Sequence, residues 1–432
     1  MSENKNRTVV LLPDRVIDGR SPQAQEHTAV VIEGQSIAAL IDKDKIPGDA
    51  ETVELAGMTL MPGMINCHEH PLMYADDYQN AHLEASSAYK ALKGLASLQR
   101  LLLHGWTGVR VLGDIDVYFA NQDIRRVIEE GVFTGPRMTC AGHYISITGG
   151  GGDINYVSPE QCLCTDGLIA DGVDEMLKAV RKEAKYGADW IKLLVTGAFM
   201  TVGDSPKNVA FSPDELRTAV EEANRLNLPV AVHAHATEGI KQAVRAGVRS
   251  IEHGTYLDDE AIELMLAHGT YLVPTIYIGD YYGKLRSLRA QEKNDDYYDQ
   301  YRDKFLFMVG KAHAAGVKIA VGLDLGGYNV DPVHFVGEFA VLVEAGLTPM
   351  EAIQAGTRIA AELLMWDRLG TIEEGQLADV IAVPGNPLDD ITALENVGFV
   401  MIDGKVVKRP GGEAPFTGIL GLPGSDPRNT MN

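Results

Sequence analysis

The feature that most constrains the fold is a regular alternation of two kinds of segment between residues 60 and 365. Short apolar runs with the length of buried strands alternate there with longer segments whose apolar residues recur at helical spacing. The strand-like runs are residues 60–67, 107–114, 137–141, 190–196, 229–233, 250–253, 270–275 and 318–324. Such alternation predicts parallel strands joined by crossover helices, and eight strands make a (β/α)8 TIM barrel. We therefore predict an α/β protein with a barrel over residues 62–365.

The connecting segments also carry helix start signals. Helical spacing predicts helices over residues 84–104, 119–132 and 171–186, with Asp171 as the N-cap of the third. Another helix is expected to open at Ser212, which is followed by a proline and two acidic residues. The longer connection over residues 277–315 is rich in tyrosine and charge. It predicts a solvated helical excursion, with a lid or a subunit contact as the alternative.

The two ends of the chain have a different pattern. Short β-type runs separated by glycine-containing turns occupy residues 8–12, 29–32, 37–41, 52–55, 378–383 and 397–407. They predict one small, discontinuous β-sandwich domain formed by residues 1–61 and 366–410. Residues 411–432 lack periodicity and are expected to form a tail.

Composition narrows the class of partner. The 432 residues include 60 acidic and 38 basic side chains, so the formal net charge is −22. This balance argues against binding nucleic acid or anionic membranes, because phosphate contacts need clustered Lys and Arg. There is neither an apolar segment of membrane-span length nor a secretory signal, so we expect a soluble, cytoplasmic protein that acts on a small molecule. Among the four cysteines, Cys162 and Cys164 are expected to be reduced loop thiols rather than a metal chelate.

Five ionisable residues fall at or near the ends of the predicted strands: His68, His70, His233, His253 and Asp324. A single His-x-His pair is often structural, and a polar residue at the end of a strand is often a cap. In a barrel, however, the carboxyl ends of all strands meet on one rim, where enzymes of this fold keep their chemistry. The five residues therefore predict one site with the character of a metal centre.

Lys192 is unusual because it lies inside the apolar run of the fourth strand. A charged lysine is costly to bury, so it must be paired, shifted to the neutral form or chemically modified. A neutral amine reacts with carbon dioxide to give a carbamate, which is an oxygen ligand able to bridge two cations. The alternative is a lysine paired to a carboxylate.

The sequence around these positions resembles the amidohydrolase superfamily. The matching motifs are TLMPGMINCHEH at 59–70, GADWIK at 187–192, VHAH at 232–235, SIEHG at 250–254 and GLD at 322–324. They occur in the order of the family, and the resemblance extends over residues 7–407. It is strongest to the prolidase and Xaa-Arg/Lys carboxypeptidase-like branch, which is related to imidazolonepropionase.

The resemblance implies a site for two divalent metal ions, usually zinc. The implied ligands are His68 and His70 on the more buried ion, a carbamate on Lys192 as the bridge, His233 and His253 on the second ion, and Asp324 on the buried ion. Asp324 is also the implied base, which takes a proton from the metal-bridging hydroxide as it attacks and returns it to the leaving amine.

The resemblance also implies residues that contact the substrate. His235 would lie at the mouth of the site, as a further catalytic candidate beside His253 that binds the substrate carboxylate or the developing oxyanion. Since His235 is two residues after His233 and on the same face, either could be the ligand of the fifth strand, and we prefer His233.

Three other substrate-binding candidates lie elsewhere: His143 and Tyr144 after the third strand, and Tyr277 after the seventh. Relatives often carry a histidine at the position of Gly151, and we expect His143 to compensate for this difference.

These observations predict a metal-dependent hydrolase that cleaves an amide bond next to a C-terminal amino acid, in a dipeptide or an N-acyl amino acid. Hydrolysis of a cyclic amide or lactone is the alternative among enzymes, and a non-catalytic binding or assembly barrel is the alternative of another class. A homo-oligomer is expected from the resemblance.

Overall fold

The protein is described by a computed structural model, which covers residues 8–46, 48, 50–73, 78–158, 160, 167–199, 201–289, 296–326 and 330–412. Within these ranges the side chains of residues 78–80, 283–289 and 296–300 are not described. The predictions for Cys162, for Cys164 and for the tail beyond residue 412 lie outside the described residues.

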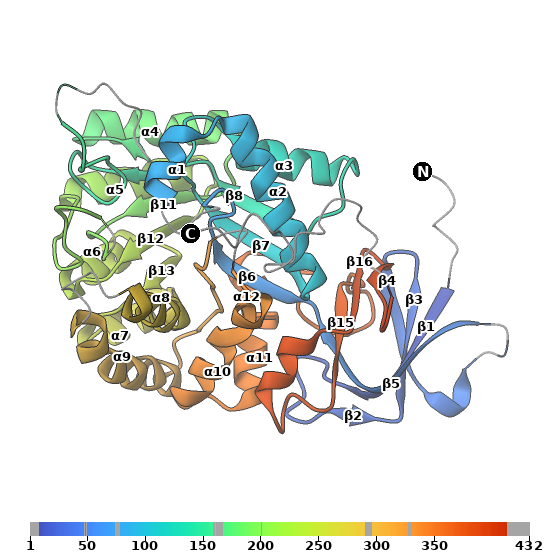
Figure 1. The fold of residues 1–432 in the computed structure, drawn as a ribbon. Coiled ribbons are helices and arrows are strands. Elements are labelled where there is room, and N and C mark those ends of the chain that lie inside the picture. The colour runs from blue at the N-terminus through green and yellow to red at the C-terminus, as the bar shows by residue number, and fades with distance from the viewer. Residues whose placement is uncertain are drawn as a thin grey trace.

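The two ends of the chain come together in one eight-stranded sheet (Figure 1). Its strands are β1 (Thr8–Val16), β2 (Gln25–Glu26), β3 (Thr28–Glu33), β4 (Ser36–Asp42), β5 (Glu51–Pro62), β15 (Val380–Pro384), β16 (Phe399–Ile402) and β17 (Lys405–Lys408). The order is β17-β16-β15-β5-β1-β3-β4, with β2 paired to β1. The antiparallel pairing of β15 with β5 joins the ends. The β-sandwich, in which two sheets pack face to face, is not confirmed.

The middle of the chain forms two parallel sheets. One contains β6 (Met64–Glu69), β7 (Trp106–Leu112) and β8 (Arg137–Ala141) in that order. The other has the order β10-β9-β11-β12-β13-β14. Its strands are β9 (Tyr144–Ser146), β10 (Leu168–Ile169), β11 (Ile191–Leu194), β12 (Val230–Ala234), β13 (Ser250–His253) and β14 (Tyr271–Val273). The predicted α/β class with parallel strands is therefore correct, although the described strands do not form a single closed sheet.

Helices connect these strands and lie outside them (Figure 1). They are α1 (Tyr78–Glu84), α2 (Ser87–Leu103), α3 (Ala120–Glu129), α4 (Val173–Lys185), α5 (Pro213–Arg225), α6 (Thr237–Ala246), α7 (Asp259–His268), α8 (Ile276–Arg289), α9 (Asp296–Ala315), α10 (Gly337–Glu344), α11 (Pro349–Ala355) and α12 (Arg358–Leu363). Short 3-10 helices occupy η1 (Lys43–Lys45), η2 (Pro332–Val336) and η3 (Ile391–Asn396). The predicted excursion after residue 277 corresponds to α8 and α9.

The start signals of two helices can be compared with the structure. Helix α5 begins as predicted, because Ser212 and Glu215 form a capping box in front of its first turn. The prediction that Asp171 caps α4 is wrong, since Gly172 is the N-cap. The carboxylate of Asp171 instead accepts hydrogen bonds from the backbone and hydroxyl of Thr148, which ties it to the loop after β9.

The predicted eighth strand, residues 318–324, is not a regular strand. It makes one parallel bridge to β14, between Ile319 and Leu272. Further along, the backbone N–H of Asp324 donates to the carbonyl oxygen of His68 over 2.8 Å. The segment therefore lies between β14 and β6, and it brings Asp324 to the carboxyl end of β6.

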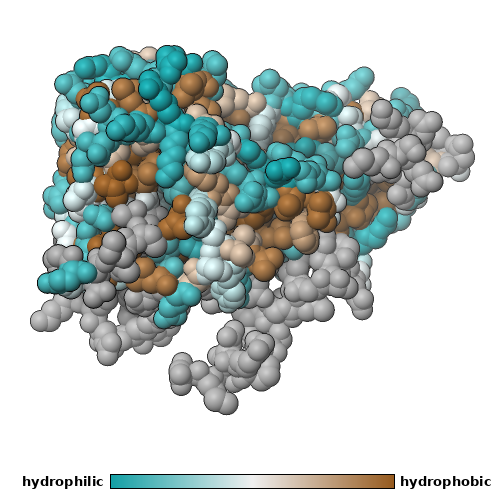
Figure 2. Space-filling view, turned by 90° about the horizontal axis from the view of Figure 1, so that it is seen from above, coloured by the Kyte–Doolittle hydropathy of each residue, from teal (hydrophilic) through white to brown (hydrophobic). Residues whose placement is uncertain are grey.

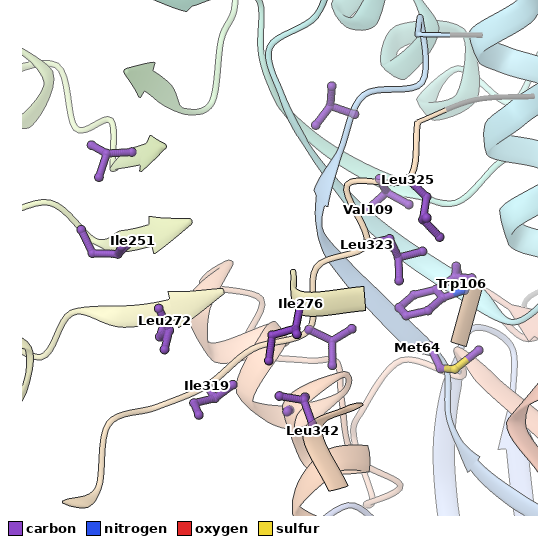
Figure 3. Packing of buried hydrophobic residues seen from close by; sticks show 14 of the residues in the cluster. Met64, Trp106, Val109, Ile251, Leu272, Ile276, Ile319, Leu323, Leu325 and Leu342 are labelled. Carbon is purple, nitrogen blue, oxygen red and sulfur yellow. The ribbon is translucent and has the colours of Figure 1, made fainter. Parts of the chain in front are cut away.

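The largest apolar core lies between the parallel strands and the helices. Figure 3 shows Leu323 of the irregular segment, and Leu325 just after it, near Val109 of β7, with Trp106 and Met64 at the other end of this group. A second core, which includes Leu55 and Phe399, belongs to the eight-stranded sheet. Burial of this apolar surface stabilises both parts of the fold and fixes the strand ends that carry the ionisable residues.

The surface is mixed in character. Figure 2 shows one face, on which hydrophilic residues surround smaller hydrophobic areas. Within the described ranges, no helix combines the length and the apolar composition that crossing a membrane requires.

Candidate metal centre

His68 and His70 lie at the carboxyl end of β6, and both are buried. Because side chains alternate along a strand, the two-residue spacing places both rings on the same face. The two Nε2 atoms are 3.2 Å apart. This is the convergence that the sequence predicts.

Hydrogen bonds determine which nitrogen of each ring is available. His70 Nδ1 lies 2.6 Å from the carbonyl oxygen of Gly113, which can only accept, so Nδ1 carries the proton. His68 Nδ1 lies 2.8 Å from Oε2 of the Glu252 carboxylate, which accepts in the same way. The Nε2 lone pairs of the two rings consequently face each other. Burial lowers the pKa of His70 to about 4 and that of His68 well below its usual value, so both rings are neutral at neutral pH.

Asp324 lies beside this pair. Its Oδ1 is 3.5 Å from His70 Nε2 and 3.7 Å from His68 Nε2. About 22% of the Asp324 side chain is exposed. Removal of the rest from water raises its pKa to about 8, against the opposing effect of Lys192. Two unprotonated ring nitrogens and a carboxylate that face one another fit a cation, which relieves the repulsion of their lone pairs.

The second group of histidines comes from β12 and β13. The rings of His233, His235 and His253 offer nitrogens that all lie within 4.8 Å of one another. The centroid of the His253 ring is 5.0 Å from that of His68, which joins this group to the first. The structure thus brings all five predicted histidines together, and both His233 and His235 stay candidates for the ligand from β12.

Each of these three rings also makes a hydrogen bond through one of its two nitrogens. His253 Nδ1 lies 2.7 Å from the Thr275 hydroxyl, and His235 Nδ1 lies 2.8 Å from the Thr255 hydroxyl. His233 differs, because its Nε2 donates to a backbone carbonyl over 3.2 Å and leaves Nδ1 available. Partners of this kind orient histidine ligands around a metal.

Lys192 occupies the interior of β11 and is buried. Among the described residues its Nζ has no hydrogen-bond partner, which argues against the alternative of a directly paired lysine. Burial lowers its pKa to about 8, while Glu252 and Asp324 act in the opposite direction. An unpaired, buried amine with a lowered pKa fits a group that reacts with carbon dioxide or coordinates a cation.

Strained backbone accompanies the strand ends. His253, Thr275 and Asp324 have φ angles of 70°, 48° and 53°, in the left-handed region that non-glycine residues rarely adopt. Such strain persists where the surrounding structure holds it, and it is concentrated at functional sites. This strain could not be located from the sequence, because even His and Asp, which are enriched in this region, adopt it in only a small fraction of cases.

Arg110 and Glu252 are two buried charged residues of the site that were not predicted from the sequence. Both side chains are inaccessible to solvent, and Arg110 Nη2 donates to Glu252 Oε1 over 2.8 Å. The available signal was a charged residue inside each of two apolar strands, β7 and β13. It predicts burial, but it does not reveal which partner lies opposite.

The residues predicted to contact the substrate lie in different surroundings. Tyr144 is buried in β9, where its backbone pairs with that of Lys192, and its ring lies 6.3 Å from that of His70. His143 is held by Glu183, whose carboxylate lies 2.7 Å from Nδ1.

The remaining candidate, Tyr277, uses its hydroxyl in a contact of 2.7 Å with His334 Nδ1. A Cβ added to Gly151 would lie 3.2 Å from the Leu194 side chain in β11. The loop that contains Gly151 is therefore close to the strand that carries Lys192.

Taken together, an α/β scaffold with neutral histidines, a carboxylate and a buried lysine at its strand ends defines a candidate centre for divalent metals. The chain belongs to the amidohydrolase family, whose sequence pattern it matches over residues 59–407. This family is generally metal-dependent, in agreement with the donor set. The protein is a hydrolase that acts on amide or peptide C–N bonds.

Three relatives illustrate the similarity. The ochratoxinase of Aspergillus niger is 33% identical over 395 residues, which cover 86% of this chain and 78% of the relative. A crystal structure of a Xaa-Pro dipeptidase with bound methionine in the active site is 34% identical and superposes with a TM-score of 0.85, covering 93% of this chain and 100% of that one. A prolidase in complex with N-methylphosphonate-L-proline is 32% identical, with a TM-score of 0.84 and coverage of 93% and 100%.

Proposed function

We propose that this protein hydrolyses the amide bond next to a C-terminal amino acid, in a dipeptide or an N-acyl amino acid, with the help of two divalent metal ions. The observation that carries the proposal is the convergence of His68 Nε2, His70 Nε2 and Asp324 Oδ1 within 3.7 Å. Two facing lone pairs beside a carboxylate are unfavourable unless a cation lies between them.

The donor atoms suggest which residues would hold each ion. His68, His70 and Asp324 would hold one, and His253 with His233 would hold the other. A carbamate on Lys192 would supply the oxygen ligand between them, which accounts for the buried and unpartnered Nζ. Zinc suits such imidazole and oxygen donors. When bound, the two ions lower the pKa of water and polarise a carbonyl group.

Asp324 is the residue that we propose to carry the proton during hydrolysis. Its Oδ1 lies beside the two histidine nitrogens and about 22% of its side chain is exposed, so the carboxylate can exchange a proton with a water molecule or a substrate. It would accept a proton from the attacking water and deliver it to the amine that leaves. His235, held by Thr255, would contact the substrate carboxylate or the oxyanion.

The substrate class rests on the relatives. One neighbour is a Xaa-Pro dipeptidase that holds methionine in its active site, and another is a prolidase that holds an N-phosphonate derivative of proline. Both ligands contain an amino acid unit, which supports an amino acid as one product here. No contact among the described site residues favours the cyclic amide or lactone alternative, and membership of a hydrolase family disfavours a non-catalytic barrel.

We also propose that the parallel strands close into a barrel. The irregular segment over residues 318–324 bonds to β14 on one side and to β6 on the other, which supports a barrel closed through this segment. We propose residues 62–365 as the barrel, with residues 1–61 and 366–410 as the smaller β domain. The cytoplasmic location, the homo-oligomer and the lack of nucleic-acid and membrane partners remain predictions.

A substrate library tests the proposed reaction. Purified, zinc-loaded protein would be incubated with dipeptides and N-acyl amino acids that differ in their C-terminal residue, and with cyclic amides and lactones as the contrasting set. We expect release of the C-terminal amino acid from part of the first set. Turnover restricted to the cyclic compounds would contradict the proposal.

A further inference from the structure

The guanidinium group of Arg110 is buried in the interior of the parallel strands. Its Nε donates to the Cys67 carbonyl over 2.6 Å, its Nη1 to the Ser250 hydroxyl over 3.0 Å and its Nη2 to Glu252 over 2.8 Å. The guanidinium also lies over the Trp190 ring, 4.6 Å from the centroid. A buried guanidinium is tolerated when its N–H groups are used and its charge is balanced, and Glu252 supplies the balancing charge.

Glu252 uses both of its oxygens in this interior. Oε1 accepts from Arg110 and, over 2.5 Å, from the Ser250 hydroxyl. Oε2 faces His68 Nδ1 at 2.8 Å. A carboxylate that already pairs with a guanidinium is an acceptor, so the His68 ring donates at Nδ1. The Nε2 lone pair of His68 therefore points to the side where His70 and the metal donors lie.

The backbone of β13 allows this arrangement. Glu252 and His253 are consecutive, and regular strand geometry would send their side chains to opposite faces. Both nevertheless lie near His68, whose ring is 5.0 Å from that of His253. The left-handed φ of 70° at His253 ends the regular alternation and turns that side chain toward the same interior. One strand end thus offers a possible metal ligand and a carboxylate that orients another ligand.

We propose that Glu252 and Arg110 are positioning residues for the metal centre, an inference that rests on the proposed metal-dependent function. Glu252 holds His68 in the Nδ1–H form with Nε2 directed at the ion, and Arg110 holds Glu252 in place. Neither residue touches the substrate. Loss of such an orienting partner typically weakens metal binding by roughly 10–100-fold.

The test measures zinc affinity rather than turnover. Wild-type protein and the Glu252→Gln variant would be stripped of metal and titrated with zinc in competition with a chromophoric chelator. We expect the variant to bind zinc roughly 10–100-fold more weakly. A double variant, Arg110→Met with Glu252→Gln, leaves no unpaired buried charge, so we expect it to be more stable than the single variant without regaining zinc affinity.

The matched control is Glu222→Gln, which removes a nearly buried carboxylate of α5 that pairs with Arg181 and Arg225. It should keep wild-type zinc affinity. The absorption spectrum of the cobalt-loaded protein provides a second readout, since it reports the ligand geometry. We expect it to change in both variants that lack Glu252 and to stay unchanged in the control.

Several results would overturn the inference. One is a folded Glu252 variant with wild-type zinc affinity and an unchanged cobalt spectrum. Another is failure of both Glu252 variants to fold, which would make the pair a requirement of the core rather than of the metal centre. If the wild-type protein bound no divalent ion at all, the proposed function itself would be wrong, and the two failures can thus be told apart.

Discussion

The backbone N–H of Asp324 donates to the carbonyl oxygen of His68 over 2.8 Å. This bond joins the end of the last predicted strand to the end of the first, although the segment that carries Asp324 has no regular strand geometry. It fixes the Asp324 carboxylate 3.5 Å from His70 Nε2. The closeness of the acidic group to the histidine pair is therefore built into the backbone.

Removal of the buried amine tests the role of Lys192. We expect Lys192→Ala to lose metal and activity, because its Nζ is buried without a described partner and a carbamate would be the oxygen ligand between two ions. Small carboxylic acids should restore part of the activity by taking the place of that ligand. Metal content would be measured by elemental analysis.

The control for this experiment is Lys408→Ala. Lys408 is a partly buried lysine of the eight-stranded sheet, and its Nζ donates to the Leu103 carbonyl. The Lys408→Ala variant should keep the metal content of the wild-type protein. Unchanged metal content in the Lys192 variant would refute a ligand role for this residue.

Replacement of the proposed proton carrier separates binding from turnover. In zinc-saturated Asp324→Asn the side chain keeps its shape and one oxygen that can face the ion, but it cannot accept and return a proton, so we expect kcat to fall by about 10²–10⁴-fold while KM changes little. Steady-state kinetics with the substrate found in the library would measure both constants. Retained turnover would mean that another group moves the proton.

A histidine outside the metal centre should make stability depend on pH. Burial lowers the pKa of His104 to about 4, from an ordinary value of 6.5. The folded state therefore binds this proton less readily than the unfolded state. The contribution of the neutral His104 ring to the free energy of unfolding is fully present above pH 6.5. It is lost as the pH falls toward 4, by up to about 3 kcal/mol at the lower end.

The comparison is between wild-type protein and His104→Gln in chemical unfolding at pH 7 and pH 4. The difference in unfolding free energy between the two pH values should be smaller in the variant. Equal pH dependence in both proteins would show that His104 is protonated as easily in the folded state as in the unfolded state.

An ion pair between the two parts of the chain should contribute to stability. Arg137 of β8 donates to both oxygens of Asp379, over 2.6 and 3.2 Å, and Asp379 is buried. In Arg137→Ala this carboxylate keeps the hydrogen bond from the Asp403 backbone but loses its cation, which should cost about 3–5 kcal/mol of unfolding free energy. The exposed pair of Arg126 with Glu130 is the control, and Arg126→Ala should change stability by less than about 1 kcal/mol. Equal effects of the two variants in denaturant unfolding would contradict this account.

Much of the site can be predicted from the sequence, because strand periodicity and strand order determine which residues share a rim. His68, His70, His233 and His253 follow apolar runs, and parallel strands bring such ends together. Lys192 could be recognised because a charged residue inside an apolar run requires an explanation.

Contacts between strands that are distant in the chain could not be predicted in this way. Periodicity gives the side of a strand on which Arg110 or Glu252 lies, but their partner is set by the packing of strands that are not neighbours in the sequence. The same limit applies to the left-handed backbone of His253 and Asp324, which depends on tertiary contacts more than on residue type. The eighth strand was predicted from its apolar run, whereas its hydrogen bonds are divided between β14 and β6.

The metal content of the purified protein, compared with its activity before and after chelation, shows whether the protein is a two-metal hydrolase. We expect close to two divalent ions per chain, loss of amide hydrolysis when they are removed, and recovery when zinc is restored. A protein that holds one ion or none, or that hydrolyses its substrate equally well after complete removal of metal, would contradict the proposed two-metal function.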